Sequence, residues 1–169
     1  MTNLERNADV VRMATYAPLF AHIEGWQWRP DAIWFNNTSK FNTCSYYVQQ
    51  LYATNKGTHV LPLTMKGKPV AGNADQDGLF ASAVLDKNDH SVIVKIVNTG
   101  EQTQTVSLKL KGWEKSSISG SLTTFHADNM DAENTLESPQ QIIPQTTKQV
   151  DNNITIPAKT FAIYRFSRK

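Results

Sequence analysis

The chain has 169 residues, a formal net charge of +2 and a single cysteine. Its length suits one ordinary domain with part of a second, and its hydrophobic content of 40% is typical of a soluble globular protein. Basic and acidic residues nearly balance, so neither nucleic acid nor an anionic membrane is expected as a partner. No apolar run is long enough to cross a bilayer, and the first residues lack the apolar stretch of a signal peptide.

The first part of the chain predicts a long helix. Thr2 and Glu5 have the spacing of a capping box, and apolar residues continue at helical spacing as far as Ala17. We therefore expect a helix over residues 2–17, which Pro18 ends.

A short strand and a second helix are expected next. The apolar run 32–35 predicts a buried strand, and the polar residues 36–42 predict a turn. Residues 43–54 predict a helix, with Gly57 as its C-terminal cap. A helix–strand–helix order is typical of the closing part of a repeated β/α fold.

From residue 58 the pattern changes to short strands with polar turns. This predicts a mainly β fold, an antiparallel β-sandwich over residues 58–169. The polar stretch 126–153 is expected to be a long surface connection. The expected strands are 79–85, 91–98, 105–111, 119–125, 154–156 and 160–166.

No cofactor, metal site or catalytic group stands out. Cys44 has no second cysteine for a disulfide or a zinc pair, so we interpret it as a small apolar residue near a helix start. Residues 73–78 resemble half of a calcium loop, but Val84 occupies the position that needs glutamate, and a simple turn is expected. The loop carboxylates Asp128, Asp131 and Glu133 lack the rigid support that paired catalytic carboxylates need.

The aromatic residues Trp26, Trp28, Trp34 and Phe35 form the most suggestive cluster. Aromatic faces stack on sugar rings, while neighbouring amides and carboxylates bond sugar hydroxyls. The alternative is that these side chains pack a seam between domains or the core of a barrel.

Four stretches together resemble a known family. They are "NADVVRMATYAPLF" (7–20), "WRPDAIWFNNTSKFNTCSYYVQQLYATNKG" (28–57), "ENTLESPQQIIP" (133–144) and "ITIPAKTFAIYRF" (154–166). This combination is similar to the C-terminal part of the α-L-arabinofuranosidases of glycoside hydrolase family 51.

The resemblance implies a (β/α)8 barrel followed by a jelly-roll-like β-sandwich. Residues 1–57 would then be helix 7, strand 8 and helix 8 of the barrel, and residues 58–169 the C-terminal sandwich. The family is retaining, and its two catalytic glutamates lie on barrel strands 4 and 7, before this chain. The resemblance therefore implies a fragment that holds no catalytic residue and is inactive alone.

It also implies a sugar contact in the intact enzyme. Active-site groups of such barrels lie at the C-terminal ends of the strands. Family members place a polar side chain from this region against the arabinose, so Trp28, Asp31 and Asn36 are the candidate substrate-binding residues.

Three hypotheses for function follow. The first is a structural C-terminal region of an enzyme that removes terminal arabinofuranosyl groups from arabinan or arabinoxylan. Its partners would be the catalytic barrel of the same polypeptide and, through it, the polysaccharide or oligosaccharide. The parent's compartment stays open between bacterial periplasm and cytoplasm. The alternative is a carbohydrate-binding module, which needs an exposed aromatic platform; Trp113 is the only tryptophan after residue 57. The third is an independent enzyme that uses the carboxylates of the 126–153 connection.

Overall fold

A six-stranded antiparallel sheet is the centre of the computed structural model, which describes residues 1–113, 118–129, 131–149 and 153–168. All five neighbouring pairs of strands in it run antiparallel, which confirms the predicted mainly β architecture. In spatial order the strands are β11 (Gln145–Gln149), β10 (Ile118–His126), β13 (Thr160–Arg168), β8 (Ser91–Asn98), β7 (Leu79–Asp86) and β4 (His59–Leu61).

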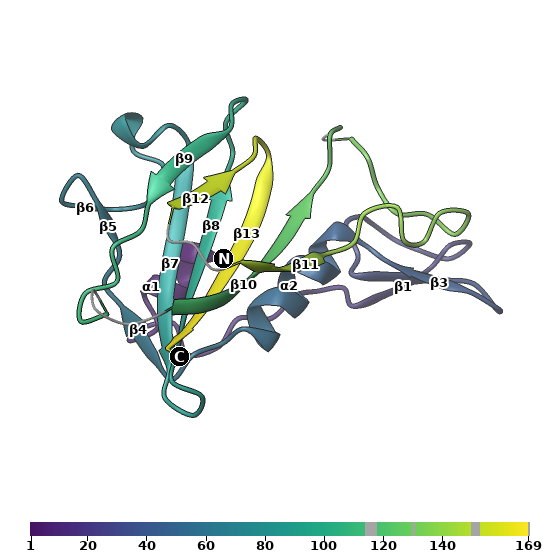
Figure 1. Cartoon of the computed structure of the whole chain (residues 1–169). Coiled ribbons are helices and arrows are strands. Elements are labelled where there is room, and N and C mark those ends of the chain that lie inside the picture. The colour runs from purple at the N-terminus through teal and green to yellow at the C-terminus, as the bar shows by residue number, and fades with distance from the viewer. Residues whose placement is uncertain (114–117, 130, 150–152, 169) are drawn as a thin grey trace.

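One face of this sheet is covered by a second, smaller β layer (Figure 1). The layer contains the pair β9 (Gln104–Ser107) and β12 (Asn153–Ile156). The short hairpin β5 (Thr64–Met65) and β6 (Lys68–Pro69) lies on the same side (Figure 1). The core between the layers contains Ala81, Ala83, Val92, Val94, Ile96, Leu108, Ile154, Ile156, Ala162, Tyr164 and Phe166.

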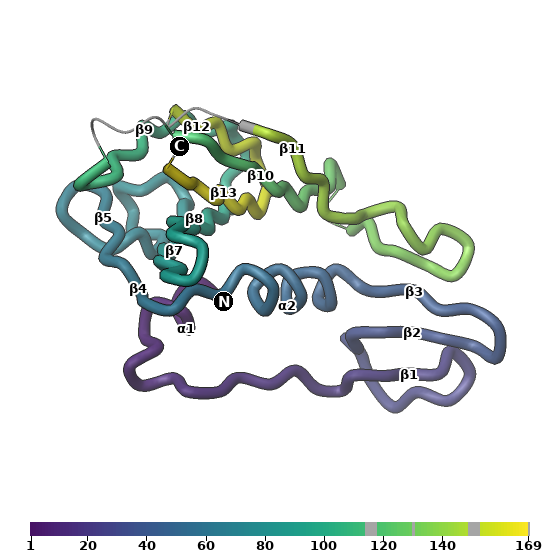
Figure 2. The backbone as a smooth tube through the Cα atoms, turned by 60° about the horizontal axis from the view of Figure 1, so that its bottom comes forward, coloured from purple at the N-terminus to yellow at the C-terminus, as the bar shows by residue number. Residues whose placement is uncertain are grey.

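The other face is covered by helices α1 (Thr2–Arg6) and α2 (Cys44–Thr54), on the side away from β9 and β12 (Figure 2). Leu51 and Tyr52 of α2 pack on Ile93 of β8 and Phe161 of β13. Since both faces of β8 are buried, its sequence, SVIVKIVN, shows almost no alternation. Residues 1–57 therefore supply one of the three layers of the molecule.

Helix α1 is held on the sheet by charged groups. The fully buried Lys95 of β8 places its Nζ 2.6 Å from Oε1 of Glu5, and Ser82 donates to the other Glu5 oxygen at 2.5 Å. Arg6 donates to the carbonyl oxygens of Val70 and Ala81 at 3.0 and 2.7 Å. Burial lowers the pKa of Lys95, although the Glu5 carboxylate opposes this effect.

The prediction of a helix over residues 2–17 is wrong after Arg6. Helix α1 ends there, with Asn7 as its C-cap, and the chain continues without regular structure to Leu19. Of the apolar residues that suggested a helical face, Val10 is 77% exposed, Ala14 and Ala17 are exposed, and Val11 is only partly buried. An amphipathic helix is stabilised mainly by packing of its apolar face, and the part of the chain that the structure describes offers that face no partner.

A small three-stranded sheet extends away from the main sheet. Strand β2 (Ile33–Phe35) was predicted; it pairs with β1 (Phe20–His22) in parallel and with β3 (Lys40–Asn42) antiparallel. Residues 36–42 are thus a hairpin turn and its returning strand, not the simple polar turn that we expected. The assignment of residues 1–57 to the end of a barrel stays a prediction.

Helix α2 begins and ends where the sequence predicts, but its C-terminal cap differs. The Thr43 hydroxyl accepts from the backbone N–H of Tyr46, which makes Thr43 the N-cap. Asn55, not Gly57, is the C-cap. A Cβ on Gly57 would lie 2.6 Å from the Cβ of Val84 and 2.8 Å from the carbonyl oxygen of Leu85. Gly57 is needed for the close approach of the chain to β7.

Two further predictions need correction. The strand expected over 105–111 ends at Ser107, although Leu108 is still buried in the core. The connection 126–153 contains β11 and a fixed loop, and it runs beside β3 (Figures 1 and 2). Asn134, buried in this loop, donates to the carbonyl oxygens of Asn42 and Ile142 at 2.9 Å each.

The buried Tyr164 predicts a loss of stability at alkaline pH. Its hydroxyl donates to the Thr155 carbonyl at 3.2 Å, and burial raises its pKa to about 12. Since the phenol ionises near pH 10 when unfolded, its contribution is present below that pH and is lost as the pH rises towards 12. Tyr164→Phe should therefore lose less stability than the wild type between pH 10 and 11.5 in urea titrations. Equal losses would contradict this assignment.

Candidate functional site

The tryptophan cluster divides into a packed part and an exposed part. Trp34 is buried, with its ring 5.6 Å from that of Trp26 in an edge-on arrangement. The Arg29 guanidinium lies 4.9 Å from the centre of the Trp34 ring and 5.6 Å from that of Trp26. Packing therefore explains Trp34, whereas Trp26 and Trp28 are 47% and 62% exposed.

Trp28 and Asp31 line one hollow of about 220 Å³ beside β1. Asp31 is only 2% exposed, and its Oδ2 accepts no hydrogen bond from the described residues. A buried carboxylate oxygen without a donor is costly. This hollow therefore combines exposed indole surface with one carboxylate oxygen, Oδ2 of Asp31, that has no donor among the described residues. Its other lining residues are Pro18, Phe20, Ala21, His22, Gly25, Trp26 and Gln27.

The third sequence candidate, Asn36, lies elsewhere. It follows the last residue of β2, whereas Asp31 precedes the first, so the two lie at opposite ends of this strand. Its Oδ1 accepts from the backbone N–H groups of Thr38 and Ser39 at 2.9 and 2.7 Å, which holds the β2–β3 turn. The structure thus groups Trp28 with Asp31, and leaves the amide N–H groups of Asn36 as donors at the other end of β2.

Sequence reasoning missed His22, which also lines the hollow. His22 is the last residue of β1, and its ring stands edge-on to Phe35 with 5.3 Å between the ring centres. Its Nδ1 accepts from the backbone N–H of Glu24 at 3.3 Å, which in the neutral ring leaves Nε2–H as the donor. A strand of three residues gives too short an alternation to be recognised, so no signal marked this position.

Of the three loop carboxylates, Asp128 contacts a histidine, whereas Asp131 and Glu133 line a hollow beside the start of α2. Asp128 lies 3.0 Å from Nε2 of His126, and the other ring nitrogen lies 3.1 Å from the Thr160 hydroxyl. This chain of acid, imidazole and hydroxyl resembles a hydrolase triad. However, Thr160 is only 1% exposed and donates to the Ala158 carbonyl, so a substrate does not reach its hydroxyl.

The calcium-like segment forms a capped turn. Residues Ala74–Gln76 form a single 3-10 turn, and Asp77 adopts a left-handed conformation with φ of 50°. The buried Gln76 accepts through Oε1 from the backbone N–H groups of Ala71 and Asn73. Within the described ranges no group of three or more His, Cys, Asp or Glu side chains is placed to hold a metal ion.

Cys44 is not set up as a nucleophile. It is half-buried at the first residue of α2. Burial, and to a lesser extent the Glu133 carboxylate, raises the pKa of the thiol. Cys44 is therefore a neutral thiol at neutral pH.

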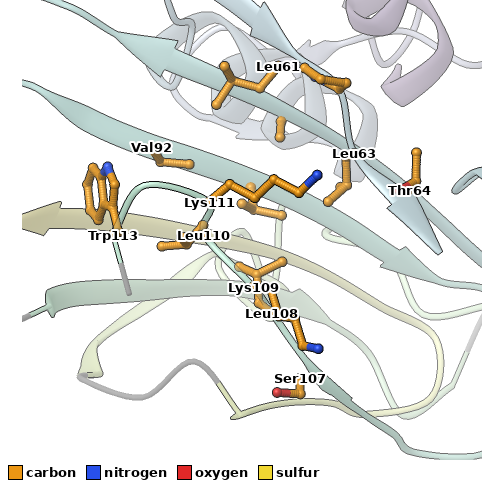
Figure 3. A pocket seen from close by; sticks show the side chains of 13 residues that line it. Leu61, Leu63, Thr64, Val92, Ser107, Leu108, Lys109, Leu110, Lys111 and Trp113 are labelled. Atoms are coloured by element: carbon orange, nitrogen blue, oxygen red, sulfur yellow. The ribbon is translucent and has the colours of Figure 1, made fainter. Parts of the chain in front are cut away.

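A groove of about 630 Å³ on the sandwich bears on the carbohydrate-binding alternative. Trp113 stands at one end, and the side chain of Lys111 lies across the groove (Figure 3). The Arg168 guanidinium lies 4.9 Å from the centre of the Trp113 ring and covers this aromatic surface. The floor contains Ala83, Val92 and Val94, which offer no polar group to a sugar. The described part of the sandwich therefore has no exposed aromatic platform.

Comparison with solved structures defines the class of domain. The chain aligns over its full length with 26% of an arabinose-bound GH51 α-L-arabinofuranosidase structure, with a TM-score of 0.86 and 30% identity. It also aligns with 33% of the GH51 arabinofuranosidase from Xanthomonas axonopodis pv. citri, with a TM-score of 0.68 over 97% of this chain. At 17% identity, the second match supports the fold alone. The fold is that of a β domain carried by enzymes of this type.

The family itself is shown by sequence. The family model for the α-L-arabinofuranosidase C-terminal domain matches residues 1–161, so the chain belongs to this family. It is 31% identical to α-L-arabinofuranosidase 1 of Arabidopsis thaliana over 97% of this chain. It is 32% identical to the probable α-L-arabinofuranosidase A of Aspergillus terreus over 96% of this chain. The chain spans about a quarter of the length of these relatives, 24% and 25%. None of its described helices is long and apolar enough to cross a membrane.

Proposed function

We propose that this domain braces the catalytic barrel of an α-L-arabinofuranosidase and contributes Trp28, Asp31 and Asn36 to the binding of its sugar substrate. Residues 1–57 would be the end of the barrel and residues 58–169 the sandwich. The substrates would be terminal arabinofuranosyl groups of arabinan or arabinoxylan. Asp31 carries the sugar part of this proposal, because its buried Oδ2 accepts no hydrogen bond from the described residues and the residue borders exposed tryptophan surface.

Bracing is supported by the apolar segment between α1 and β1. Val10, Met13 and Leu19 of this segment, and Phe20 at the start of β1, are all at least half exposed. Strand β1 pairs with β2 alone in the described sheet, which leaves its other edge open. A barrel that supplies a neighbouring strand and apolar side chains would cover both features.

The chemical contribution of this domain would be binding and orientation. The carboxylate pair that a retaining glycosidase needs would come from the barrel. Trp28 would present an aromatic face to the sugar ring, and Asp31 would accept a hydrogen bond from a sugar hydroxyl. Asn36, whose carbonyl oxygen is engaged by the turn, would donate through its amide N–H groups.

Substituting Trp28 and Asp31 should test the sugar contact in a polypeptide that carries both barrel and sandwich. Asp31→Asn removes a charged acceptor, so we expect kcat/KM for an aryl α-L-arabinofuranoside to fall about 10- to 100-fold. Trp28→Ala should act in the same direction through loss of stacking.

Trp113→Phe, a change on the far side of the sandwich, is the matched control and should leave kcat/KM unchanged. Hydrolysis that is insensitive to both Trp28→Ala and Asp31→Asn, in variants that melt like the wild type, would refute the sugar contact. It would leave bracing as the function of the domain.

A further inference from the structure

The groove of about 630 Å³ on the sandwich takes no part in the sugar contact proposed above. It lies between residues 61–64, which lead from β4 to β5, and residues 107–111, which continue the chain from β9. Ala83 of β7 and Val92 and Val94 of β8 form its floor. The volume falls within the range of about 300–1,000 Å³ that is typical of pockets for small organic molecules.

The walls of the groove are apolar and belong to the edge of the sandwich core. Leu61 and Leu63 form one wall, and Leu108 and Leu110 form the other. Leu108 is buried, and the other three leucines are half-buried against the same core cluster. A ligand with an apolar body would remove its own surface and that of the walls from water, which favours binding.

Two lysines give this apolar groove a positive charge. Lys109 and Lys111 line it, and none of its described lining residues is acidic. The Lys111 side chain lies across the groove and points toward Leu63 (Figure 3). Both lysines are exposed, and neither forms an ion pair with a carboxylate of the described residues. The Lys111 ammonium is therefore available to pair with an anion that enters the groove.

Apolar walls and unpaired ammonium groups together define the chemistry of the ligand. A neutral sugar would find only the hydroxyls of Thr64 and Ser107 and the indole N–H of Trp113 as uncharged polar side-chain groups. An organic cation would meet two positive charges. A phosphate ester on a polar body would lose its hydration against the leucine walls. A carboxylate on an apolar chain fits both features, because the chain covers the walls and the charge pairs with lysine.

We propose that the groove binds an amphiphilic carboxylate of the fatty-acid type, with its chain along Val92 and Val94 and its carboxylate on Lys111. Lys109 adds positive potential on the same wall. The ligand lies on one face of β7 and β8, and on the other face Ser82 and Lys95 of these strands bind Glu5 of α1. A ligand that binds only the folded domain raises its melting temperature.

Calorimetric titration tests the proposal in a polypeptide that carries both barrel and sandwich, in which the barrel is proposed to cover the apolar segment before β1. Decanoate is the probe. Decyltrimethylammonium has the same chain and the opposite charge, so it is the matched control ligand, and both are used below their critical micelle concentrations. We expect one saturable site for decanoate, a melting temperature that rises with decanoate, and no such site for the cation. Absence of decanoate binding, or equal binding of the cation, would overturn the proposal.

A pair of lysine variants tests the charge contact. Lys111→Gln should weaken decanoate binding about three- to tenfold, because it removes the ammonium and keeps most of the side chain. Lys87→Gln is the matched control, since Lys87 is an exposed lysine in the turn between β7 and β8 that does not line the groove. It should bind decanoate like the wild type. Equal affinities of Lys111→Gln and the wild type would also overturn the proposal, while Trp28→Ala and Asp31→Asn test the sugar contact separately.

Discussion

Replacing Glu5 with glutamine should lower the free energy of unfolding by about 3–5 kcal/mol, because it leaves the fully buried Lys95 ammonium without its charge partner. Ser82 and Arg6 still bond the same region, but neither supplies a negative charge. Urea unfolding at pH 7, followed by tryptophan fluorescence, measures the change. Helix α1 should also exchange its amide protons faster in this variant.

A double variant separates charge from packing. Glu5→Gln combined with Lys95→Met removes the unpaired charge and keeps most of the buried volume, so it should recover much of the lost stability. If Glu5→Gln alone lowers the free energy of unfolding by less than about 1 kcal/mol, the Glu5–Lys95 pair contributes no more than an exposed ion pair. That result would contradict its role in holding α1 on the sheet.

The same lysine predicts how stability changes with pH. Its pKa is lowered in the folded protein from an ordinary value of 10.5, so the unfolded chain binds this proton more readily in the interval between the two values. Stability should therefore rise with pH as Lys95 loses its proton below pH 10.5. Lys95→Met should lack this rise. The free energy of unfolding is measured in urea at a series of pH values for the wild type and for Lys95→Met, and the difference between the two proteins removes the tyrosine effect that both share above pH 10. A difference that does not change with pH would contradict the prediction.

Phe161→Ala should cost about 3–5 kcal/mol and release α2 from the sheet. The Phe161 ring stacks on Tyr52 of α2 with 5.3 Å between ring centres and 12° between planes. It is also part of the cluster formed by Ile93, Ile163 and Leu51. Removing the ring opens a cavity where α2 meets the sheet. Hydrogen exchange of the α2 amides, read together with urea unfolding, reports both effects.

Phe161→Leu is the conservative control and should lose clearly less stability, since it keeps much of the apolar volume. If the α2 amides stay protected from hydrogen exchange in Phe161→Ala, other contacts hold the helix. The contact between Phe161 and α2 would then not be what fixes the helix to the sheet. The result bears on function because α2 carries the chain from β3, beside the candidate site, to the sandwich.

Much of the β domain could be predicted from local pattern. Residues 79–85 and 91–98 are rich in apolar side chains, and a polar turn lies between them. The structure pairs these two segments as the hairpin β7–β8. The apolar spacing of residues 43–54 predicted helix α2, because helical spacing acts within a few residues. The quoted motifs also indicated the family, which the family model confirms over residues 1–161.

Other features depended on residues far apart in the chain. Lys95 in an apolar strand gave no local hint that Glu5 would reach it from 90 positions away. The sequence predicted Gly57 as a helix cap, whereas the structure shows that Val84 leaves no space for a Cβ at this position. The missing donor at Asp31 likewise appears only when its surroundings are assembled.

A physical cause separates the features that the sequence predicted from those that only the structure showed. Periodicity and capping depend on neighbours within a turn or a strand, so the sequence alone indicated the mainly β domain, helix α2 and the hairpin. Burial and ion pairing depend on which elements meet, so only the tertiary fold decided that helical spacing after Arg6 would not form a helix. For the same reason, only the fold brought Trp28 and Asp31 into one hollow and left Asn36 outside it.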